Sequence, residues 1–206
     1  MQLMTLPFRL LVIADRGVCA TDDEFLARVE RVGAVSEVWL QLRIKTAPLA
    51  DRALLLTAAA DLLGEARARA LVNGTLAEAR DLGCAGAHYP EIALPSELED
   101  HAGLFVGASV HTLPARQAAE EAGVDYLIAG SVFAPSSKPG EARGLDWLGT
   151  MARGSTIPVI AIGGITPHNV RDCLAAGASG VAVLGGIFLA DDPAPAAAAY
   201  QAALAR

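Results

Sequence analysis

Cysteine is scarce in this sequence, and the cysteines that occur stand far apart. Cys19, Cys84 and Cys173 are spread over 206 residues, each in an apolar or loop context. An odd and scattered set of this kind predicts reduced thiols and excludes a disulfide framework or a cysteine-rich zinc site. We therefore expect a cytoplasmic protein.

Positive charge is also in short supply. Sixteen Lys and Arg residues stand against 23 Asp and Glu residues, which gives a formal net charge of −7. This balance argues against nucleic acid or an acidic membrane surface as a partner. A small anionic ligand fits, because a few local cations can oppose the overall sign. The oligomeric state stays open, and a homo-oligomer is compatible with the sequence.

From the sequence we expect no targeting segment, membrane span or interdomain linker. Its start, "MQLMTLPFRLLVIADRG", has no basic region, and Arg9 and Asp15 bracket the apolar run, so neither a signal peptide nor a transmembrane helix is predicted. No Ser-rich or Pro-rich stretch separates two halves. A chain that is 53% hydrophobic and 19% charged is expected to fold, and its length suits one domain over residues 1–206.

Short β-rich runs alternate with helical patterns along the whole chain. Several of the runs are almost entirely apolar, as in parallel sheets that are covered on both faces. Eight such alternations predict a single (β/α)8 barrel, with an open doubly wound sheet as the alternative. The expected strands are 9–15, 38–43, 69–73, 86–89, 104–109, 126–130, 158–164 and 180–184. The expected helices are 22–34, 48–66, 75–82, 95–101, 114–122, 144–153, 167–176 and 194–205.

In such a barrel the chemistry sits at the carboxyl ends of the strands. The second strand ends in "QLRIK", and because side chains alternate along a strand, Gln41, Arg43 and Lys45 share one face. The other face carries apolar residues and is expected to pack against helices. Two cations and an amide on the inner face resemble a clamp for phosphate or carboxylate. The same pattern is also typical of a strand end whose polar side chains are simply exposed to solvent.

Further polar residues follow the third to sixth strands. Asn73 and Gly74 follow the third and are also typical of a simple turn, while His88 ends the fourth and is also typical of a buried polar group. Thr112 is expected to cap the helix after the fifth strand. The polar loop after the sixth strand, "SVFAPSSKPG", suits either a phosphate or a mobile surface loop. The remaining candidates are Ser109, His111, Ser131 and Lys138.

Glycine pairs follow the last two strands. Gly163 and Gly164 close "VIAIGG", and Gly185 and Gly186 follow "GVAVL". Glycine permits tight turns with positive φ, and it also lets a phosphate approach backbone N–H groups. Many barrels bind phosphate with the loops after strands seven and eight. Two pairs at these two positions therefore predict an anion site.

Taken together, these motifs resemble the thiamine phosphate synthase family and its TenI-like thiazole tautomerase relatives. The resemblance covers most of the chain, and "SVFAPSSKPG" and "IGGIT" are its most specific blocks. It implies a (β/α)8 barrel that binds a thiazole phosphate at the glycine pairs. It also implies that a second set of residues lines the place where a synthase holds its pyrimidine diphosphate: Gln41, Arg43, Lys45, Asn73, Ser109 and Lys138.

The sequence departs from the family pattern at three positions. A synthase has aspartates at the places of Gly74 and Ala93, and these hold a magnesium ion. The tautomerase branch has a histidine at the place of Ser131. We therefore expect no resident metal or other cofactor, with magnesium relevant only if the chain is a synthase, where Glu91 or water would complete a weaker site.

Three functions follow from this resemblance. We expect a thiazole phosphate tautomerase in which a proton is transferred by His111, His88, Lys45 or Ser131, since imidazole titrates near neutral pH. The alternatives are a magnesium-dependent thiamine phosphate synthase and a non-catalytic protein that binds the phosphorylated ligand.

Overall fold

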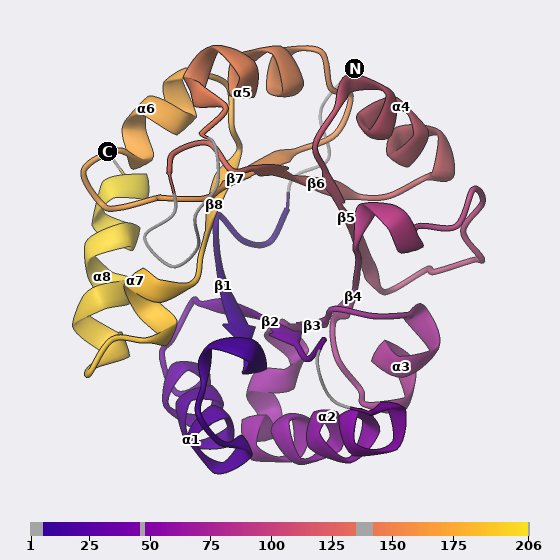
Figure 1. The fold of residues 1–206 in the computed structure, drawn as a ribbon, viewed down its shortest axis with the longest axis vertical. Coiled ribbons are helices and arrows are strands. Elements are labelled where there is room, and N and C mark those ends of the chain that lie inside the picture. The colour runs from indigo at the N-terminus through magenta and orange to yellow at the C-terminus, as the bar shows by residue number, and fades with distance from the viewer. Residues whose placement is uncertain (1–5, 46–47, 135–141, 206) are drawn as a thin grey trace.

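Eight parallel strands form a closed barrel in the computed structural model, which describes residues 6–45, 48–134 and 142–205. Each strand pairs with the next one in the sequence, and β8 pairs with β1 to close the ring (Figure 1). The (β/α)8 barrel predicted from the sequence is confirmed, and the open sheet is excluded. The strands are β1 (Leu10–Asp15), β2 (Trp39–Arg43), β3 (Ala70–Val72), β4 (Gly86–Tyr89), β5 (Phe105–Val110), β6 (Tyr126–Gly130), β7 (Val159–Ile162) and β8 (Gly180–Val183).

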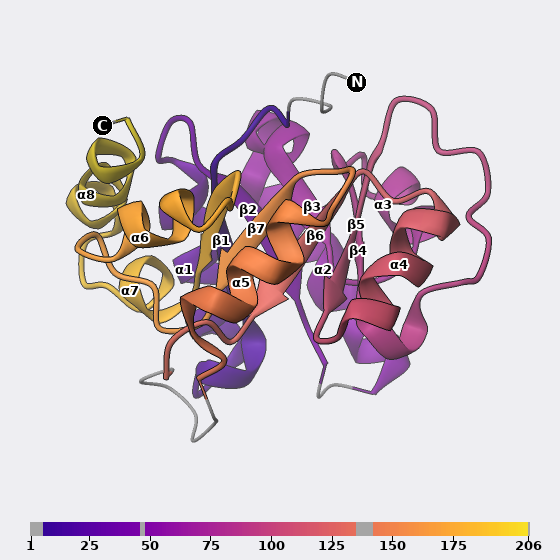
Figure 2. The ribbon, with the colours of Figure 1, turned by 90° about the horizontal axis from the view of Figure 1, so that it is seen from above.

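Helices surround the barrel and cover the outer face of its strands (Figures 1 and 2). None of the described helices is both long enough and apolar enough to span a membrane. The α-helices are α1 (Asp22–Gly33), α2 (Leu49–Leu63), α3 (Leu76–Asp81), α4 (Leu113–Ala122), α5 (Gly144–Arg153), α6 (Val170–Ala175), α7 (Gly185–Phe188) and α8 (Pro193–Leu204). Three 3₁₀ turns are η1 (Arg16–Val18), η2 (Gly64–Arg69) and η3 (Glu91–Ala93).

Side-chain caps explain where several helices begin. The hydroxyl of Thr112 accepts a hydrogen bond from the backbone N–H of Ala115, as expected for the start of α4. Thr75 and Glu78 form a reciprocal capping box at the start of α3, which satisfies two backbone donors that the helix leaves without partners. These caps fix where α3 begins after β3 and where α4 begins after β5.

The prediction of a helix over 95–101 was wrong. The chain there has no regular structure, and η3 precedes it at 91–93. The segment has few apolar residues, and side-chain contacts hold its backbone instead. Arg80 donates hydrogen bonds to a carboxylate oxygen of Glu99 at 2.7 Å and to the backbone oxygen of Asp100 at 2.5 Å. The helix expected over 167–176 is shorter, as α6, and the four-residue α7 was not predicted.

Apolar residues form two clusters, one on each face of the strands. The larger cluster lies between strands and helices and includes Leu40 and Leu42, on the apolar face of β2, and Ile44, just after it. The smaller cluster fills the barrel interior, where the ring of Phe8 lies 4.9 Å from that of Trp39 and 5.5 Å from that of Tyr126. This aromatic floor lies below the polar strand ends.

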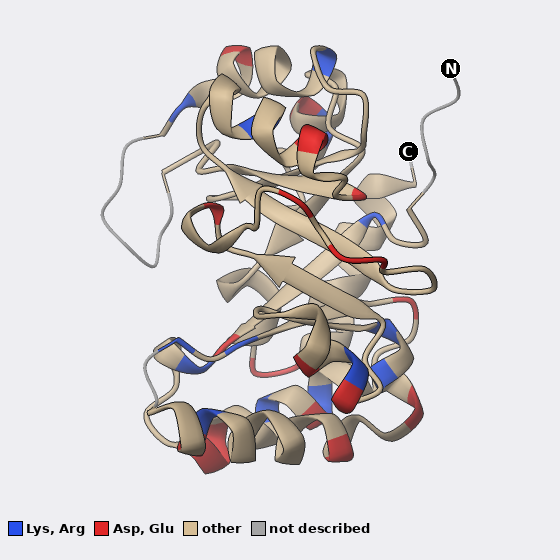
Figure 3. Ribbon diagram, turned by 90° about the vertical axis from the view of Figure 1, so that its right-hand side faces the viewer, with Lys and Arg blue, Asp and Glu red and all other residues tan. Residues whose placement is uncertain are grey.

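Charged residues lie mainly on helices and connecting loops, and the strands are almost without them (Figure 3). Within the eight strands, all of whose residues the structure describes, Asp15 and Arg43 are the only Asp, Glu, Lys or Arg residues. The two are register partners on β1 and β2. The two charged residues within the strands therefore lie side by side, at the carboxyl ends of β1 and β2.

Candidate active site

A cavity of about 870 Å³ lies at the carboxyl ends of the strands. Its volume is within the range of small-molecule sites. The structure brings together around it every sequence-predicted site residue that it describes: Gln41, Arg43, Lys45, Asn73, His88, Ser109, His111, Ser131, Gly163, Gly164, Gly185 and Gly186. Lys138 lies outside the described residues.

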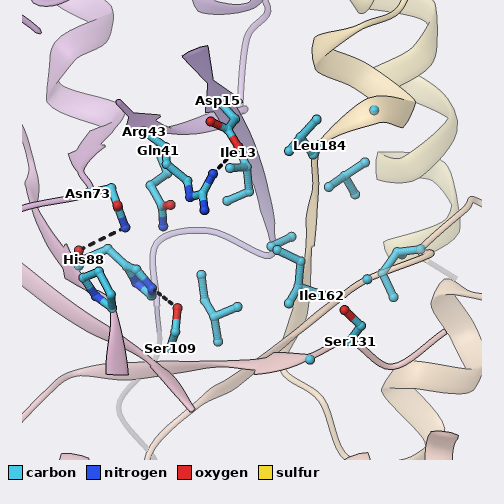
Figure 4. A pocket seen from close by; sticks show the side chains of 18 of the residues that line it. Ile13, Asp15, Gln41, Arg43, Asn73, His88, Ser109, Ser131, Ile162 and Leu184 are labelled. Atoms are coloured by element: carbon cyan, nitrogen blue, oxygen red, sulfur yellow. Dashed lines mark hydrogen bonds and ion pairs between the residues drawn. The ribbon is translucent and has the colours of Figure 1, made fainter. Parts of the chain in front are cut away.

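One wall of the cavity is polar. Gln41, Arg43 and Lys45 line it, as the alternation along β2 predicts. Gln41 is 3% exposed, and its amide nitrogen has no hydrogen-bond partner among the described residues. A buried N–H₂ group without a partner is costly, so this wall offers a donor to a bound ligand. Figure 4 shows this wall opposite Leu184, Ile162 and Ser131.

Asp15 is a site residue that the sequence reasoning missed. Its carboxylate is buried, accepts a hydrogen bond from the backbone N–H of Gly17 at 3.0 Å, and forms an ion pair with Nη1 of Arg43 (Figure 4). Asp15 ends β1 on the same inward face as Leu11 and Ile13, so the period of two could have found it. The pair fixes the position of the guanidinium at the cavity.

His88 lies at the inner end of the polar wall. It is 1% exposed, its Nε2 lies 2.8 Å from Oγ of Ser109, and its Nδ1 lies 3.1 Å from the hydroxyl of Tyr126. Burial, reinforced by the positive charges of Lys45 and Arg43, lowers the pKa of His88 to about 3. A catalytic base works best with a pKa near the working pH. This environment therefore argues against the general base expected from the sequence and favours a neutral hydrogen-bonding group.

His111 lies at the rim in a different environment. Its side chain is 52% exposed, and its Nδ1 lies 2.7 Å from a carboxylate oxygen of Glu91. The same oxygen accepts a hydrogen bond from the backbone N–H of His111 at 2.8 Å. Glu91 thus orients His111 toward one edge of the cavity. The neighbouring Ile92 is 99% exposed and also lines the rim.

Glycine stands at the four positions of the two pairs for different physical reasons. Gly163 and Gly164 adopt φ of 99° and 61°, which other residues rarely adopt. A Cβ on Gly164 would also lie 2.7 Å from the backbone oxygen of Ala134, and one on Gly186 would lie 2.2 Å from the hydroxyl of Tyr200. Gly185 has a negative φ, and among the described residues, apart from its chain neighbours and its own helix backbone, the nearest atom to an added Cβ is 4.0 Å away. Backbone conformation and packing therefore explain three of these glycines, and neither explains Gly185.

Arg143 is a second residue that the sequence reasoning missed. It lines the cavity, its backbone N–H donates to the oxygen of Ser131 at 3.0 Å, and its guanidinium lies 5.0 Å from the centre of the Trp147 ring. A guanidinium over an indole face is held by cation–π attraction. No local sequence signal marks Arg143, since it depends on the return of the sixth loop to the barrel.

Comparisons with known proteins identify relatives of this chain. A family model described as thiamine monophosphate synthase matches residues 10–187. The chain belongs to this family. A thiamine-phosphate synthase of Haloarcula marismortui is 37% identical over 194 residues, covering 89% of this chain and 90% of that protein. A putative thiamine-phosphate synthase of Geobacter sulfurreducens is 34% identical, covering 96% and 94%. The solved thiamine phosphate pyrophosphorylase of Pyrococcus furiosus superimposes with a TM-score of 0.79 at 30% identity, covering 97% and 96%.

A second cavity, of about 390 Å³, adjoins the first and contains the two positions where the family pattern has aspartates. Gly74 and Ala93 line it and supply no side-chain oxygen. A Cβ on Gly74 would meet Oε2 of Glu78 at 2.1 Å and Nη2 of Arg52 at 2.7 Å. The ion pair between Arg52 and Glu78 therefore occupies the space beside Gly74.

The residues present do not fit a magnesium ion. Magnesium takes hard oxygen ligands, usually one or two carboxylates with substrate phosphates. The carboxylates nearby are already engaged, Glu78 with Arg52 and Glu91 with His111. Within the described part of the chain, no three or more His, Cys, Asp or Glu side chains gather as metal ligands. Beside Gly74, one of the positions where the family pattern has an aspartate, this chain has a guanidinium–carboxylate pair.

Proposed function

We propose that this chain is an enzyme that joins a pyrimidine diphosphate to a thiazole phosphate, the reaction named for its thiamine-phosphate synthase relatives. The observation that carries this proposal is a single cavity with two places suited to anions. Arg43 and Lys45 line it at the end of β2, and Gly185 lines it after β8, on the other side of β1. A reaction between two phosphorylated substrates needs two such places, whereas an isomerase of one phosphorylated substrate needs one. The sequence reasoning favoured the tautomerase, and the relatives favour the synthase.

Arg43, which ends β2, and Lys45, which follows it, have a defined role in this reaction. A bond forms between the thiazole nitrogen and the pyrimidine's carbon that carries the diphosphate, the bond from that carbon to the diphosphate oxygen breaks, and the diphosphate leaves with the electron pair. Arg43 and Lys45 oppose the negative charge that develops on the leaving group. Asp15 keeps the guanidinium of Arg43 in position. After β8, the absence of a side chain on Gly185 leaves room for the phosphate of the thiazole.

The test is direct synthesis. The protein is incubated with both phosphorylated halves, and thiamine phosphate and released diphosphate are measured. We expect both products in equal amounts, and a strong loss of rate in Lys45→Met. Leu49→Met, an exposed position on α2, is the matched surface control. No thiamine phosphate above the uncatalysed background would overturn the proposal.

A tautomerase acting on the thiazole phosphate alone is the second candidate. Gly74 and Ala93 favour it, because a proton-transfer isomerase has no diphosphate to neutralise and needs no metal carboxylates. His111, oriented by Glu91, is its best placed acid–base group. Incubation with carboxythiazole phosphate alone distinguishes the two candidates: isomerisation without the pyrimidine half supports the tautomerase. A His111→Gln variant would then lose the activity.

A further inference from the structure

Three buried or partly buried polar side chains form a hydrogen-bonded row across β4, β5 and β6. The row runs from the hydroxyl of Tyr126 to Nδ1 of His88 at 3.1 Å, and from Nε2 of His88 to Oγ of Ser109 at 2.8 Å. Tyr126 is fully buried in the aromatic floor, and Ser109 lines the cavity. The row therefore connects the barrel interior to the candidate site.

The direction of the hydrogen bonds follows from the donors available. Burial raises the pKa of Tyr126, so the phenol keeps its proton. Among the described residues, Nδ1 of His88 is the one acceptor within reach of that hydroxyl. A buried O–H left without an acceptor is destabilising. The arrangement without an orphaned donor has Tyr126 donating to Nδ1, which leaves the proton of neutral His88 on Nε2.

The same arrangement fixes the role of Ser109. Nε2–H of His88 donates to Oγ of Ser109, so the hydroxyl hydrogen of Ser109 has to point to another acceptor. Among the described residues no other acceptor for that hydroxyl is within hydrogen-bond distance, and Oγ lines the cavity (Figure 4). We propose that Tyr126 and His88 are positioning residues that make Ser109 a hydrogen-bond donor to the bound substrate. This proposal rests on the proposed function only in identifying the cavity as the substrate site.

Gly107 supplies an independent structural observation. A Cβ on this residue of β5 would lie 2.1 Å from Cζ and 2.5 Å from the hydroxyl oxygen of Tyr126. Glycine at this position therefore lets the phenol cross over β5 to reach His88 on β4. The two rings lie 5.7 Å apart and are tilted by 35°. The backbone is thus shaped to allow this one hydrogen bond.

The proton positions can be measured without substrate. Full-length protein labelled with ¹⁵N in histidine is studied by long-range ¹H–¹⁵N NMR. The signals of His88 are assigned by their loss in His88→Gln. We expect His88 to be neutral with its proton on Nε2, and to stay so from pH 8 to pH 5. A proton on Nδ1, or an equal mixture of the two tautomers, would overturn the proposal.

Tyr126→Phe tests the origin of this tautomer. Removal of the phenol hydroxyl frees Nδ1, so we expect the tautomers of His88 to mix. Tyr89→Phe is the matched control, because Tyr89 is also buried but its hydroxyl accepts from the backbone N–H of Leu76. Tyr89→Phe should leave the signals of His88 unchanged. An unchanged tautomer in Tyr126→Phe would show that the phenol does not set it.

A double-variant cycle tests the link to the ligand. The dissociation constant for the pyrimidine diphosphate is measured by calorimetry in the parent protein, Tyr126→Phe, Ser109→Ala and the double variant. We expect Ser109→Ala to weaken binding about 5- to 10-fold and Tyr126→Phe about threefold, as the loss of neutral hydrogen bonds would. In the Ser109→Ala background, Tyr126→Phe should have no further effect.

The outcomes of the two experiments separate the two proposals. Independent, multiplying effects in the cycle would show that Tyr126 does not act through Ser109 and would overturn the inference. If the parent protein does not bind the pyrimidine diphosphate, the proposed function fails, and with it the role of Ser109 toward this substrate. The NMR result still decides the proton positions in that case.

Discussion

The carboxylate of Asp15 and the guanidinium of Arg43 meet at adjacent strand ends and form an ion pair at the wall of the cavity. The side chain of Asp15 is 4% exposed, and that of Arg43 is 24% exposed. A buried carboxylate that loses its cation is destabilising. Arg43→Met should therefore lower the free energy of unfolding by about 1–3 kcal/mol, measured by urea denaturation.

The double variant is the control for this prediction. Asp15→Asn with Arg43→Met removes both charges, so we expect it to be more stable than Arg43→Met alone. Its affinity for the pyrimidine diphosphate should nevertheless stay low, because the cation is still absent. Equal stability of the single and double variants would contradict the assignment of the loss to an uncompensated Asp15.

Gly185→Ala should separate binding from folding. Among the described residues outside its own helix backbone and chain neighbours, the nearest atom to the added Cβ is Leu189 Cδ1 at 4.0 Å, so the melting temperature should change little. Affinity for the thiazole phosphate, measured by calorimetry, should fall at least tenfold, because the methyl group occupies the space for the phosphate. Gly164→Ala is the contrasting variant: its positive φ and backbone clash should destabilise the fold itself. Unchanged affinity in Gly185→Ala would exclude this part of the cavity as the phosphate site.

His88 should make the protein less stable in mild acid. Its pKa is about 3 in the folded protein and about 6.5 in an unfolded chain. The unfolded state therefore binds a proton that the folded state does not, so the contribution is complete above pH 6.5 and is lost as the pH falls toward 3. The expected slope approaches 1.4 kcal/mol per pH unit below pH 6.5.

Urea denaturation at pH 7.5, 6.5 and 5.5 measures this slope. His88→Gln should be less stable at every pH, but its free energy of unfolding should depend less on pH over this range. His168→Gln changes an exposed histidine and should leave the slope as it is. A slope that is the same in His88→Gln and the parent would show that another group is responsible.

Gly74 and Ala93 should make any synthase activity slow and insensitive to magnesium. Without positioned carboxylates we expect a turnover below about 1 s⁻¹, the lower end of typical enzymes, and little change on adding a chelator. Gly74→Asp with Ala93→Asp should introduce magnesium dependence, because the two added carboxylates supply the hard oxygen ligands that magnesium takes. Rapid, chelator-sensitive turnover by the parent protein would contradict this prediction.

Alternation along the strands explains how much of the site could be predicted. The polar face of β2 follows from the period of two, and the barrel rule places it beside residues from other strand ends. Asp15 was missed because a lone aspartate before Arg16-Gly17 reads as the start of a turn. The period of two along β1 could have placed Asp15 on the inward face, but its ion-pair partner Arg43 lies on the neighbouring strand, 28 residues away in the sequence.

The remaining differences also have tertiary causes. The helix expected over 95–101 is replaced by a segment held by Arg80, which no local pattern reveals. The sequence showed that His88 ends a strand, and left open whether it is a catalyst or a buried polar group. Its partners Tyr126 and Ser109, which decide between these roles, come from two other strands. At three of the four glycines that follow the last two strands, a side chain would clash with the sixth loop or with α8. These contacts are between segments far apart in the sequence.

The contact between Arg143 and Trp147 gives the protein an optical reporter at the rim of the cavity. The chain has two tryptophans, and Trp39 is enclosed in the aromatic floor next to Phe8. An anion that draws the guanidinium of Arg143 away from the indole would change the emission of Trp147 and leave that of Trp39 nearly constant. A Trp39→Phe variant would then carry a single fluorophore, and stopped-flow mixing could follow the arrival of ligand in real time without any added dye.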